Sequence, residues 1–259
     1  MSVKTEHLLD TPVHAVTYHE VLSAVTGWIA DHDRKAATIV HTNALTLVTA
    51  QEDRSYREVV RGADLSLPDG MPIVWLLRRR GFRMQSRIYG PDLLVALAEQ
   101  AAAKGWRCFL YGGAPGVPEA VERTLEDRFP GILIVGTCSP PFRPLTADED
   151  DEISAMIRAA RPDILWVSLG GAKQDRWIAE HRTRLGPCVM HGVGAAFDFL
   201  AGKVPQAPRW MMNAGLEWLF RLLVEPRRLW KRYTVKNFKF CYYVMTREIL
   251  RRAKTRENI

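Results

Sequence analysis

The sequence of 259 residues predicts an α/β fold, with a largely parallel β-sheet and helices on both of its faces. Short apolar segments typical of buried strands alternate with longer segments of helical periodicity along most of the chain. Several predicted strands run directly into glycine-rich turns, which is typical of doubly wound, Rossmann-like sheets. A hydrophobic content of 47% is sufficient to build the core of such a domain.

The individual elements are predicted from the spacing of apolar residues. Strands are expected at 37–40, 64–67, 108–111, 132–136, 163–169 and 188–190. Helices are expected at 18–31, 44–61, 73–77, 91–103, 117–128 and 147–160, and in a segment that ends near His181. Strand and helix thus alternate as a parallel sheet requires.

The composition changes near residue 205, where we place the boundary between an α/β domain (1–204) and a C-terminal helical appendage (205–259). Two amphipathic helices are expected in the appendage, at 209–225 and 234–254, separated at Pro226. Residues 203–259 contain 14 Lys or Arg and four Asp or Glu, a net charge of +10 in a chain whose total is +7. Aromatic side chains lie between these cations, a pattern that suits an anionic membrane surface. In the alternative interpretation, the apolar faces pack on the α/β domain.

The sequence shows no pattern of a secreted, membrane-spanning or metal-binding protein. The four cysteines form no Cys-x-x-Cys pair and are expected to be reduced thiols. Neither a signal pattern nor an apolar run of about 18 residues is found. The Asp-x-Asp strings that begin at Asp31 and Asp148 lie in a linker and in the first turn of a helix, so no metal is expected there. We therefore expect a cytoplasmic protein without a cofactor.

The residues around Asp69 supply the first candidate for chemistry. Leu65 and Leu67 alternate with polar residues as in a short strand, Pro68 ends that strand, and Pro72 suits the first turn of a new helix. Asp69 is therefore expected at a strand end, where open α/β sheets bind their ligands. Two interpretations are open at this point. Asp69 either caps the following helix or acts on a bound ligand.

Further polar residues and glycines follow other predicted strands. The polar residues are Thr42, Asn43, Lys173, Gln174 and Asp198, and the glycines are Gly112, Gly113, Gly192 and Gly194. In a doubly wound sheet these residues can meet in one crevice, unless each polar side chain only caps its own helix. Amides can bind sugar hydroxyls, and a lysine together with glycine-rich turns suits a diphosphate.

Two other classes of function fit parts of the sequence. A nicotinamide-dependent oxidoreductase would use the same sheet, but Gly192-x-Gly194 lacks the third glycine of the dinucleotide fingerprint. A nucleic-acid-binding protein would use the basic appendage, and its binding would depend steeply on salt. This second class assigns no role to the polar strand ends, so we expect no nucleic acid as partner.

Taken together, the motifs resemble those of the WecG/TagA/CpsF family of bacterial glycosyltransferases (glycosyltransferase family 26). The similar segments lie in order at 43–44, 68–72, 87–92, 109–113, 169–174, 192–198, 207–210, 215–218 and 225–227. The resemblance implies transfer of a sugar from a UDP-sugar to a polyprenyl-diphosphate-linked saccharide, with inversion at the anomeric carbon and no required metal. It implies a role in exopolysaccharide, teichoic acid or common antigen synthesis, and an appendage that brings the enzyme to the inner face of the plasma membrane.

By position, the resemblance makes Asp69 the general base and Gln174 the active-site glutamine, with Asn43 as a further catalytic candidate. The family often has Thr-x-Asn at the first strand end, whereas this chain has His41-Thr42-Asn43. A shift of one residue along a strand moves a side chain to the opposite face. The sequence therefore leaves open whether His41 or Thr42 faces the substrate.

The leaving UDP requires charge stabilisation, for which the appendage offers several arginines. The candidates are Arg209, Arg221, Arg227 and Arg228. The sequence specifies neither the transferred sugar nor the lipid-linked acceptor, and it leaves open whether the chain forms a homo-oligomer.

Overall fold

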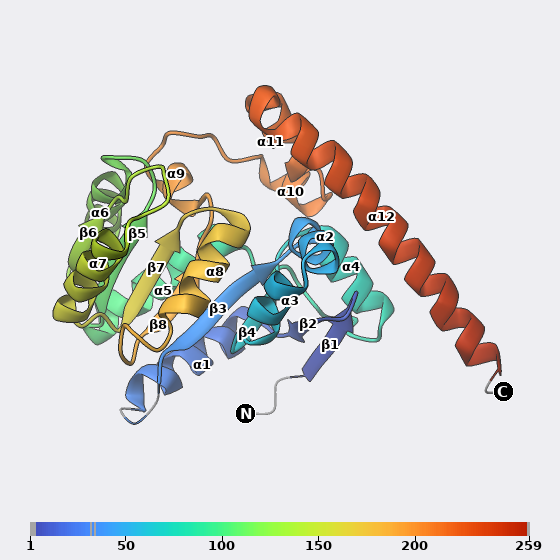
Figure 1. The fold of residues 1–259 in the computed structure, drawn as a ribbon, viewed down its shortest axis with the longest axis horizontal. Coiled ribbons are helices and arrows are strands. Elements are labelled where there is room, and N and C mark those ends of the chain that lie inside the picture. Colours follow the sequence, from blue (N-terminus) through green and yellow to red (C-terminus); the bar gives the residue numbers. More distant parts are fainter. Residues whose placement is uncertain (1–3, 32, 34, 258–259) are drawn as a thin grey trace.

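The computed structural model describes residues 4–31, 33 and 35–257, and in the last helix the side chains at 228, 231, 232 and 248–257 fall outside that description. Within the described residues, parallel strands form a six-stranded sheet in the order β4-β3-β8-β7-β5-β6 (Figure 1). The strands are β3 (Ala37–Thr42), β4 (Leu65–Pro68), β5 (Arg107–Gly112), β6 (Leu133–Cys138), β7 (Ile164–Ser168) and β8 (Val189–Gly192). Their parallel pairing confirms the predicted Rossmann-like α/β fold.

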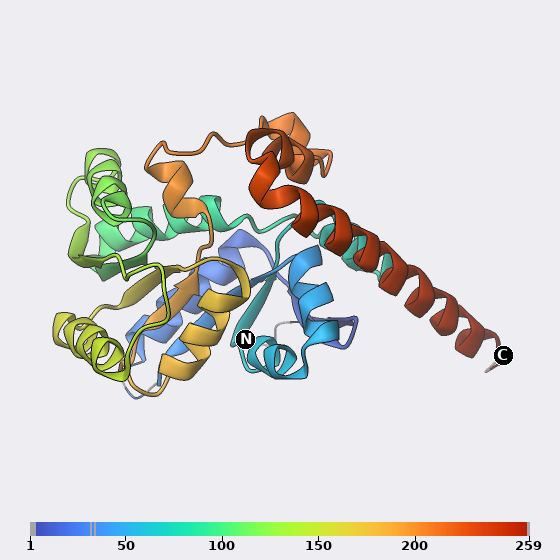
Figure 2. The same ribbon diagram turned by 45° about the horizontal axis from the view of Figure 1, so that its top comes forward.

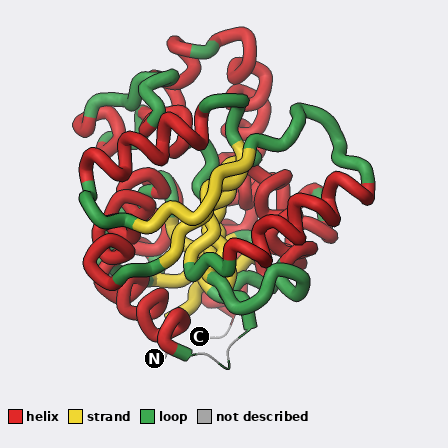
Figure 3. The backbone as a smooth tube through the Cα atoms, turned by 90° about the vertical axis from the view of Figure 1, so that its left-hand side faces the viewer, coloured by secondary structure: helices red, strands yellow, loops and turns green. Residues whose placement is uncertain are grey.

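Helices cover both faces of this sheet, and Figure 3 shows the strands between two layers of helix. One layer contains α1 (Tyr18–Ala30), α5 (Gly90–Lys104) and α6 (Val117–Arg128), and the other contains α7 (Ala147–Ala160) and α8 (Gly171–His181). Val25 of α1 and Leu97 of α5 are buried in one core with Ile39 of β3. Ile157 of α7 is buried with Leu165 of β7 in the core on the opposite face.

The N-terminal residues form a β-hairpin that had not been expected. In it, β1 (Lys4–Leu8) pairs antiparallel with β2 (Thr11–Ala15). The turn residues Leu9 and Asp10 have φ angles of 48° and 57°, a left-handed conformation for which Asn and Gly are usual. Because Leu-Asp is not a typical turn signal, the sequence pattern did not reveal the hairpin.

The prediction of a single helix over 44–61 was wrong, because the helix is interrupted at Asp53. The observed helices are α2 (Ala44–Glu52) and α3 (Arg54–Arg61). Asp53 has an extended backbone between them, and its side chain accepts hydrogen bonds from the Tyr56 N–H and the Ser55 hydroxyl. It is therefore the N-cap of α3, a role that Asp favours over a helix interior.

The C-terminal helices also begin and end at other residues than expected. The segment 209–225 forms two helices, α10 (Arg209–Asn213) and α11 (Glu217–Val224), separated at Gly215, whose φ is 73°. The helix expected to begin at 234 begins at Pro226 and forms α12 (Pro226–Glu257). Proline suits the first turn of a helix, so Pro226 starts α12 as well as ending α11.

In Figures 1 and 2, α12 is the long helix that runs past α2 and α4 (Met71–Arg79). Phe240 is 8% exposed and joins Leu47 of α2 and Ile73 of α4 in one apolar cluster. On the other face of α12, Phe238 and Tyr242 are 75% and 60% exposed. Part of the apolar surface of the appendage thus packs on the α/β domain, and part faces outward.

Over the described residues, no helix combines the length and the apolarity that crossing a bilayer requires. The division of the chain at residue 204 stays a prediction.

Candidate active site

A cavity of about 650 Å³ lies at the carboxyl ends of β3, β7 and β8, where doubly wound sheets bind their ligands. Most of the predicted site residues line it: His41, Asn43, Asp69, Gly113, Lys173, Gln174, Gly192, Gly194, Asp198 and Arg221. Another cavity, of about 390 Å³, lies at the amino ends of the strands and contains none of them. The fold therefore brings residues that are far apart in the sequence into one crevice.

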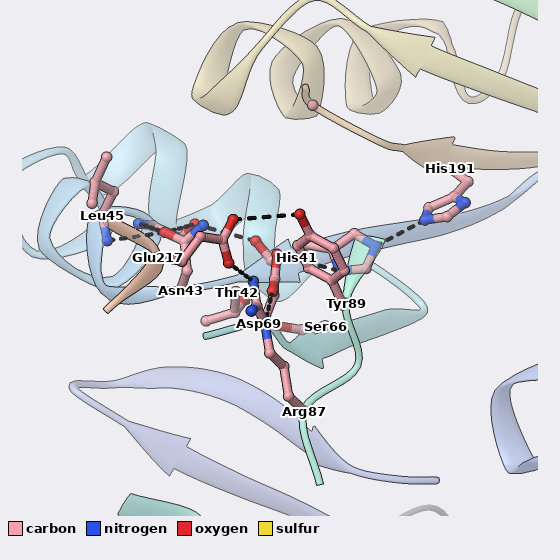
Figure 4. A network of polar contacts seen from close by, with 12 residues as sticks. His41, Thr42, Asn43, Leu45, Ser66, Asp69, Arg87, Tyr89, His191 and Glu217 are labelled. Atoms are coloured by element: carbon pink, nitrogen blue, oxygen red, sulfur yellow. Dashed lines mark hydrogen bonds and ion pairs between the residues drawn. The ribbon is translucent and has the colours of Figure 1, made fainter. Parts of the chain in front are cut away.

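Asp69 lines this cavity and does not cap the helix that follows it. The N-cap residue of α4 is Gly70, and no side chain forms a capping hydrogen bond at the start of this helix. The Oδ1 atom of Asp69 instead accepts a hydrogen bond of 2.8 Å from Nε of Arg87 (Figure 4). The side chain of Asp69 is 17% exposed, so its carboxylate lies at the wall of the cavity and can reach a bound ligand.

Arg87 links Asp69 to the C-terminal segment. Its Nη2 atom lies 2.6 Å from Oε2 of Glu217 on α11, and its guanidinium lies 4.1 Å from the centre of the Tyr89 ring. Burial alone would lower the pKa of Arg87, but the two carboxylates outweigh this effect and raise it. Arg87 therefore stays positively charged. Through its contacts with Asp69 and Glu217 it connects the end of β4 to α11.

The structure decides between His41 and Thr42. The hydroxyl of Thr42 lies 2.6 Å from that of Ser66 on β4, and Thr42 is fully buried away from the cavity. His41 faces the cavity, with its Nδ1 atom 4.0 Å from Oδ2 of Asp69. Because neighbouring residues on a strand face opposite ways, His41 lines the cavity and Thr42 does not.

Asn43 lies in the cavity wall and is also the N-cap of α2. Its side-chain oxygen accepts hydrogen bonds from the N–H groups of Leu45 and Thr46, at 3.0 and 3.1 Å. The capping alternative considered for the polar strand ends is thus correct for Asn43. Its amide NH₂ is the part of this side chain that can donate to a ligand.

Gln174 shapes the turn after β8. Its side-chain oxygen accepts a hydrogen bond of 3.0 Å from the N–H of Gly194, and the residue is 5% exposed. A Cβ atom at Gly192 would lie 2.8 Å from Nε2 of Gln174, so the amide packs against the backbone there. Gln174 therefore fixes the position of a glycine turn as well as lining the cavity.

The two glycines after β5 have different surroundings. Gly113 lines the cavity. Gly112 has a φ of 111°, and a Cβ atom there would lie 2.3 Å from the carbonyl oxygen of Ser168. Gly112 is thus required for close packing of β5 on β7 and does not line the cavity.

Among the appendage arginines whose side chains the structure describes, Arg221 lines the cavity. It is 20% exposed, lies 3.8 Å from Glu225, and has a buried Nε without a hydrogen-bond partner. Arg209 instead forms a two-pronged ion pair with Asp92, at 2.6 and 3.0 Å, and is 68% exposed. Arg227 is exposed on α12 and does not line the cavity. The side chain of Arg228 lies outside the described residues.

Several residues of the site had not been assigned a role from the sequence. Arg87 and Glu217 lie within segments that carry the family resemblance, and this was the available signal. His191 carried no signal, because its partner His41 lies 150 residues away. Among the described residues, no group of three or more His, Cys, Asp or Glu side chains is arranged to hold a metal ion.

Comparison with known proteins identifies the family of the chain. Residues 6–255 match the model of the glycosyl transferase WecG/TagA/CpsF family, and the chain belongs to that family. It is therefore a glycosyltransferase, and the oxidoreductase and nucleic-acid alternatives are set aside.

Two curated relatives, from Bacillus subtilis strain 168 and Bacillus spizizenii strain W23, carry the same name, N-acetylglucosaminyldiphosphoundecaprenol N-acetyl-β-D-mannosaminyltransferase. The first is 32% identical over 224 residues, which cover 85% of each chain. The second is 36% identical over 199 residues, which cover 76% of this chain and 75% of the relative.

Asp175 follows Gln174 in the chain and also lines the cavity, and it makes the stability of the protein depend on pH. It is 3% exposed and accepts a hydrogen bond of 2.6 Å from the Tyr56 hydroxyl. Burial raises the pKa of Asp175 to about 6, although this hydrogen bond opposes the shift. The folded protein thus holds the proton more tightly than the unfolded chain, and this contribution to stability is lost as the pH rises through 6.

We expect Asp175→Asn to remove this pH dependence. Relative to wild type, its free energy of unfolding should increase by about 2 kcal/mol between pH 4.5 and 7.5, measured by urea denaturation. The exposed Asp127→Asn is the control and should show no such trend. A parallel pH dependence of wild type and Asp175→Asn would show that Asp175 is not a buried, ionising carboxyl.

Proposed function

We propose that this glycosyltransferase is inverting and metal-independent, and that it transfers a sugar from a UDP-sugar to a polyprenyl-diphosphate-linked saccharide of a bacterial cell-surface polysaccharide. The observation that supports this most strongly is the position of Asp69 at the cavity wall, held by Arg87 and not used as a helix cap. The names of the two Bacillus relatives make N-acetylglucosaminyldiphosphoundecaprenol the first acceptor to test and N-acetylmannosamine the first sugar.

In the proposed reaction, Asp69 acts as the general base. It accepts the proton of the acceptor hydroxyl while the hydroxyl oxygen attacks the anomeric carbon, and the bond from that carbon to UDP breaks with its electron pair on the diphosphate. Arg87 holds Oδ1, so Oδ2 is the oxygen that faces the acceptor. General-base catalysis of this kind contributes roughly 10²–10⁴-fold to the rate.

The negative charge that develops on the leaving diphosphate must also be stabilised. The turns at Gly113 and Gly194 bring backbone to the cavity wall, and Lys173 and Arg221 add positive charge there. Backbone N–H groups and fixed cations in a cavity stabilise a developing anion without rearranging during the reaction. We assign the diphosphate to this side of the cavity.

Asp69→Asn should lower UDP release at least about 100-fold, because the amide cannot accept the proton. Its oxygen can still accept the hydrogen bond from Arg87, so folding and UDP-sugar binding should be retained. The assay uses a panel of UDP-sugars, a short-chain polyprenyl-diphosphate-linked acceptor, and EDTA in parallel samples. Turnover of the variant near the wild-type rate would contradict the base assignment, and loss of wild-type activity in EDTA would contradict metal independence.

Arg221→Gln should raise the KM for the UDP-sugar by roughly 10- to 100-fold, the range expected for a lost charge-assisted hydrogen bond to the diphosphate. Arg209→Gln is the matched control, since Arg209 belongs to the same segment but pairs with Asp92 outside the cavity. Steady-state kinetics of both variants compares the two positions. A larger effect at Arg209 than at Arg221 would reverse the assignment.

We further propose that the appendage holds the enzyme on the cytoplasmic face of the plasma membrane, where a lipid-linked acceptor would be reached. Large apolar side chains are exposed on α10, α11 and α12: Trp210, Trp218, Leu223, Trp230, Phe238 and Tyr242. In Figure 1, α10 and α11 lie on the side toward which the parallel strands point. Exposed aromatic residues in a segment of net positive charge suit an anionic lipid interface.

Trp230→Ala combined with Phe238→Ala should weaken binding to phosphatidylglycerol vesicles at least about tenfold, because each side chain contributes apolar area to the interface. Flotation with these vesicles measures the effect, and phosphatidylcholine vesicles test the contribution of charge. The control is Leu133→Ala, which removes an exposed apolar side chain at the amino end of β6. Equal binding by the control and the double variant would remove this surface from the proposal.

A further inference from the structure

Two histidines beside Asp69 have no role in the mechanism described above. His41 lines the cavity, and His191 on β8 lies behind it, fully buried. Their Nε2 atoms are 2.8 Å apart, and Figure 4 shows the two rings joined at this contact. On its other side, His41 presents Nδ1 to Oδ2 of Asp69 at 4.0 Å. The three side chains thus form a chain from the interior to the proposed base.

Both rings are neutral at physiological pH. Burial lowers the pKa of His41, although Asp69 and the Ile88 backbone oppose this. Burial also holds the pKa of His191 well below its ordinary value, and the neighbouring His41 lowers it further. A neutral imidazole carries one proton, so one ring donates and the other accepts at the Nε2 contact. Two arrangements of the protons are then available.

If Nε2 of His41 were the donor, Nε2 of His191 would be the acceptor, and the proton of His191 would lie on its buried Nδ1 atom. Neither Nδ1 atom has a hydrogen-bond partner in the structure, so that N–H would be an unsatisfied donor. The lone pair of His41 Nδ1 would also point at the Asp69 carboxylate and be repelled by it.

If His191 is the donor, the proton of His41 lies on Nδ1 and faces the Asp69 carboxylate at 4.0 Å, an attractive electrostatic contact. Nδ1 of His191 is then an acceptor lone pair without a partner, and no buried N–H of His191 is left unpaired. We propose that His191 holds His41 in this Nδ1–H tautomer, and that His41 is thereby a positioning residue for Oδ2 of Asp69. The inference rests on the proposed role of Asp69 as the base.

The arrangement restrains both oxygens of the carboxylate. Arg87 binds Oδ1 at 2.8 Å, and the His41 N–H faces Oδ2. A separation of 4.0 Å is an electrostatic contact and not a hydrogen bond, and such contacts commonly shorten when substrate fills the site. The proton taken from the acceptor stays on Asp69, because His41 offers it no free lone pair on that side.

The tautomers can be observed directly by nitrogen NMR of the full-length protein labelled at histidine. Long-range proton–nitrogen correlation spectra at pH 7.5, assigned with His41→Asn and His191→Gln, should show His41 protonated at Nδ1 and His191 at Nε2. A proton on Nε2 of His41, or a doubly protonated ring at either position, would overturn the proposal. This result does not depend on turnover, so it is distinct from a failure of Asp69→Asn to lose activity.

Matched variants test whether the tautomer matters for the rate. His41→Leu and His191→Phe should each lower kcat about tenfold with the KM for the UDP-sugar unchanged. The first removes the N–H that faces Asp69, and the second removes the donor that holds His41 in its tautomer. His41→Asn retains an N–H near the Nδ1 position, and His191→Gln retains one near Nε2, so each should recover most of the loss. Equal rates within each pair, or a wild-type kcat in His41→Leu, would overturn the proposal.

Discussion

The ion pair between Arg87 and two carboxylates joins the two parts of the chain that the site requires. Asp69 comes from the end of β4, and Glu217 comes from α11 in the C-terminal segment. All three side chains are 14–18% exposed, so water screens their charges only in part. Removing one member of such a pair leaves the others poorly compensated, which is far more costly than breaking an ion pair at the surface. The position of the proposed base therefore depends on an arginine from the connection between α4 and α5 and on a glutamate from the start of α11.

The strand register provides the rest of the arrangement. Thr42 of β3 pairs with Pro68 of β4, and the Asp69 N–H donates to the Thr42 carbonyl at 2.9 Å. This pairing puts the residues after both strands at the same edge of the sheet. His41 and Asn43 thus lie beside Asp69 although nearly thirty positions separate them in the chain. On the other side of the crevice, Gln174 fixes the Gly194 turn.

The alternation of strand and helix was enough to predict the fold, because both faces of a parallel sheet must be covered and the periodicity of each element shows how it is buried. Asp69 and Gln174 were recognisable through their strand-end contexts and the family resemblance. Local signals failed where a tertiary contact decides the outcome. Asp53 breaks a helix by capping the next one, Leu9 and Asp10 form a turn without the usual residues, and His191 is connected to the cavity only through its contact with His41.

The C-terminal segment illustrates the same limit. Its amphipathic pattern predicted an apolar face but not which partner covers it. Phe240 and Phe238 are two positions apart on α12, and only Phe240 is buried against α2 and α4. The charged residues of this segment likewise divide between internal ion pairs, such as that of Arg209 with Asp92, and the cavity, where Arg221 lies. Sequence alone does not distinguish such neighbours, since the choice depends on packing.

The central claim is a single displacement driven by Asp69, and the configuration of the product tests it most directly. With a UDP-sugar of α configuration that supports UDP release, the one-bond carbon–hydrogen coupling at the anomeric carbon of the lipid-linked product reports its configuration. Our account predicts a β-linked product, formed with inversion. An α-linked product, formed with retention, would contradict the role of Asp69 as a base in one displacement.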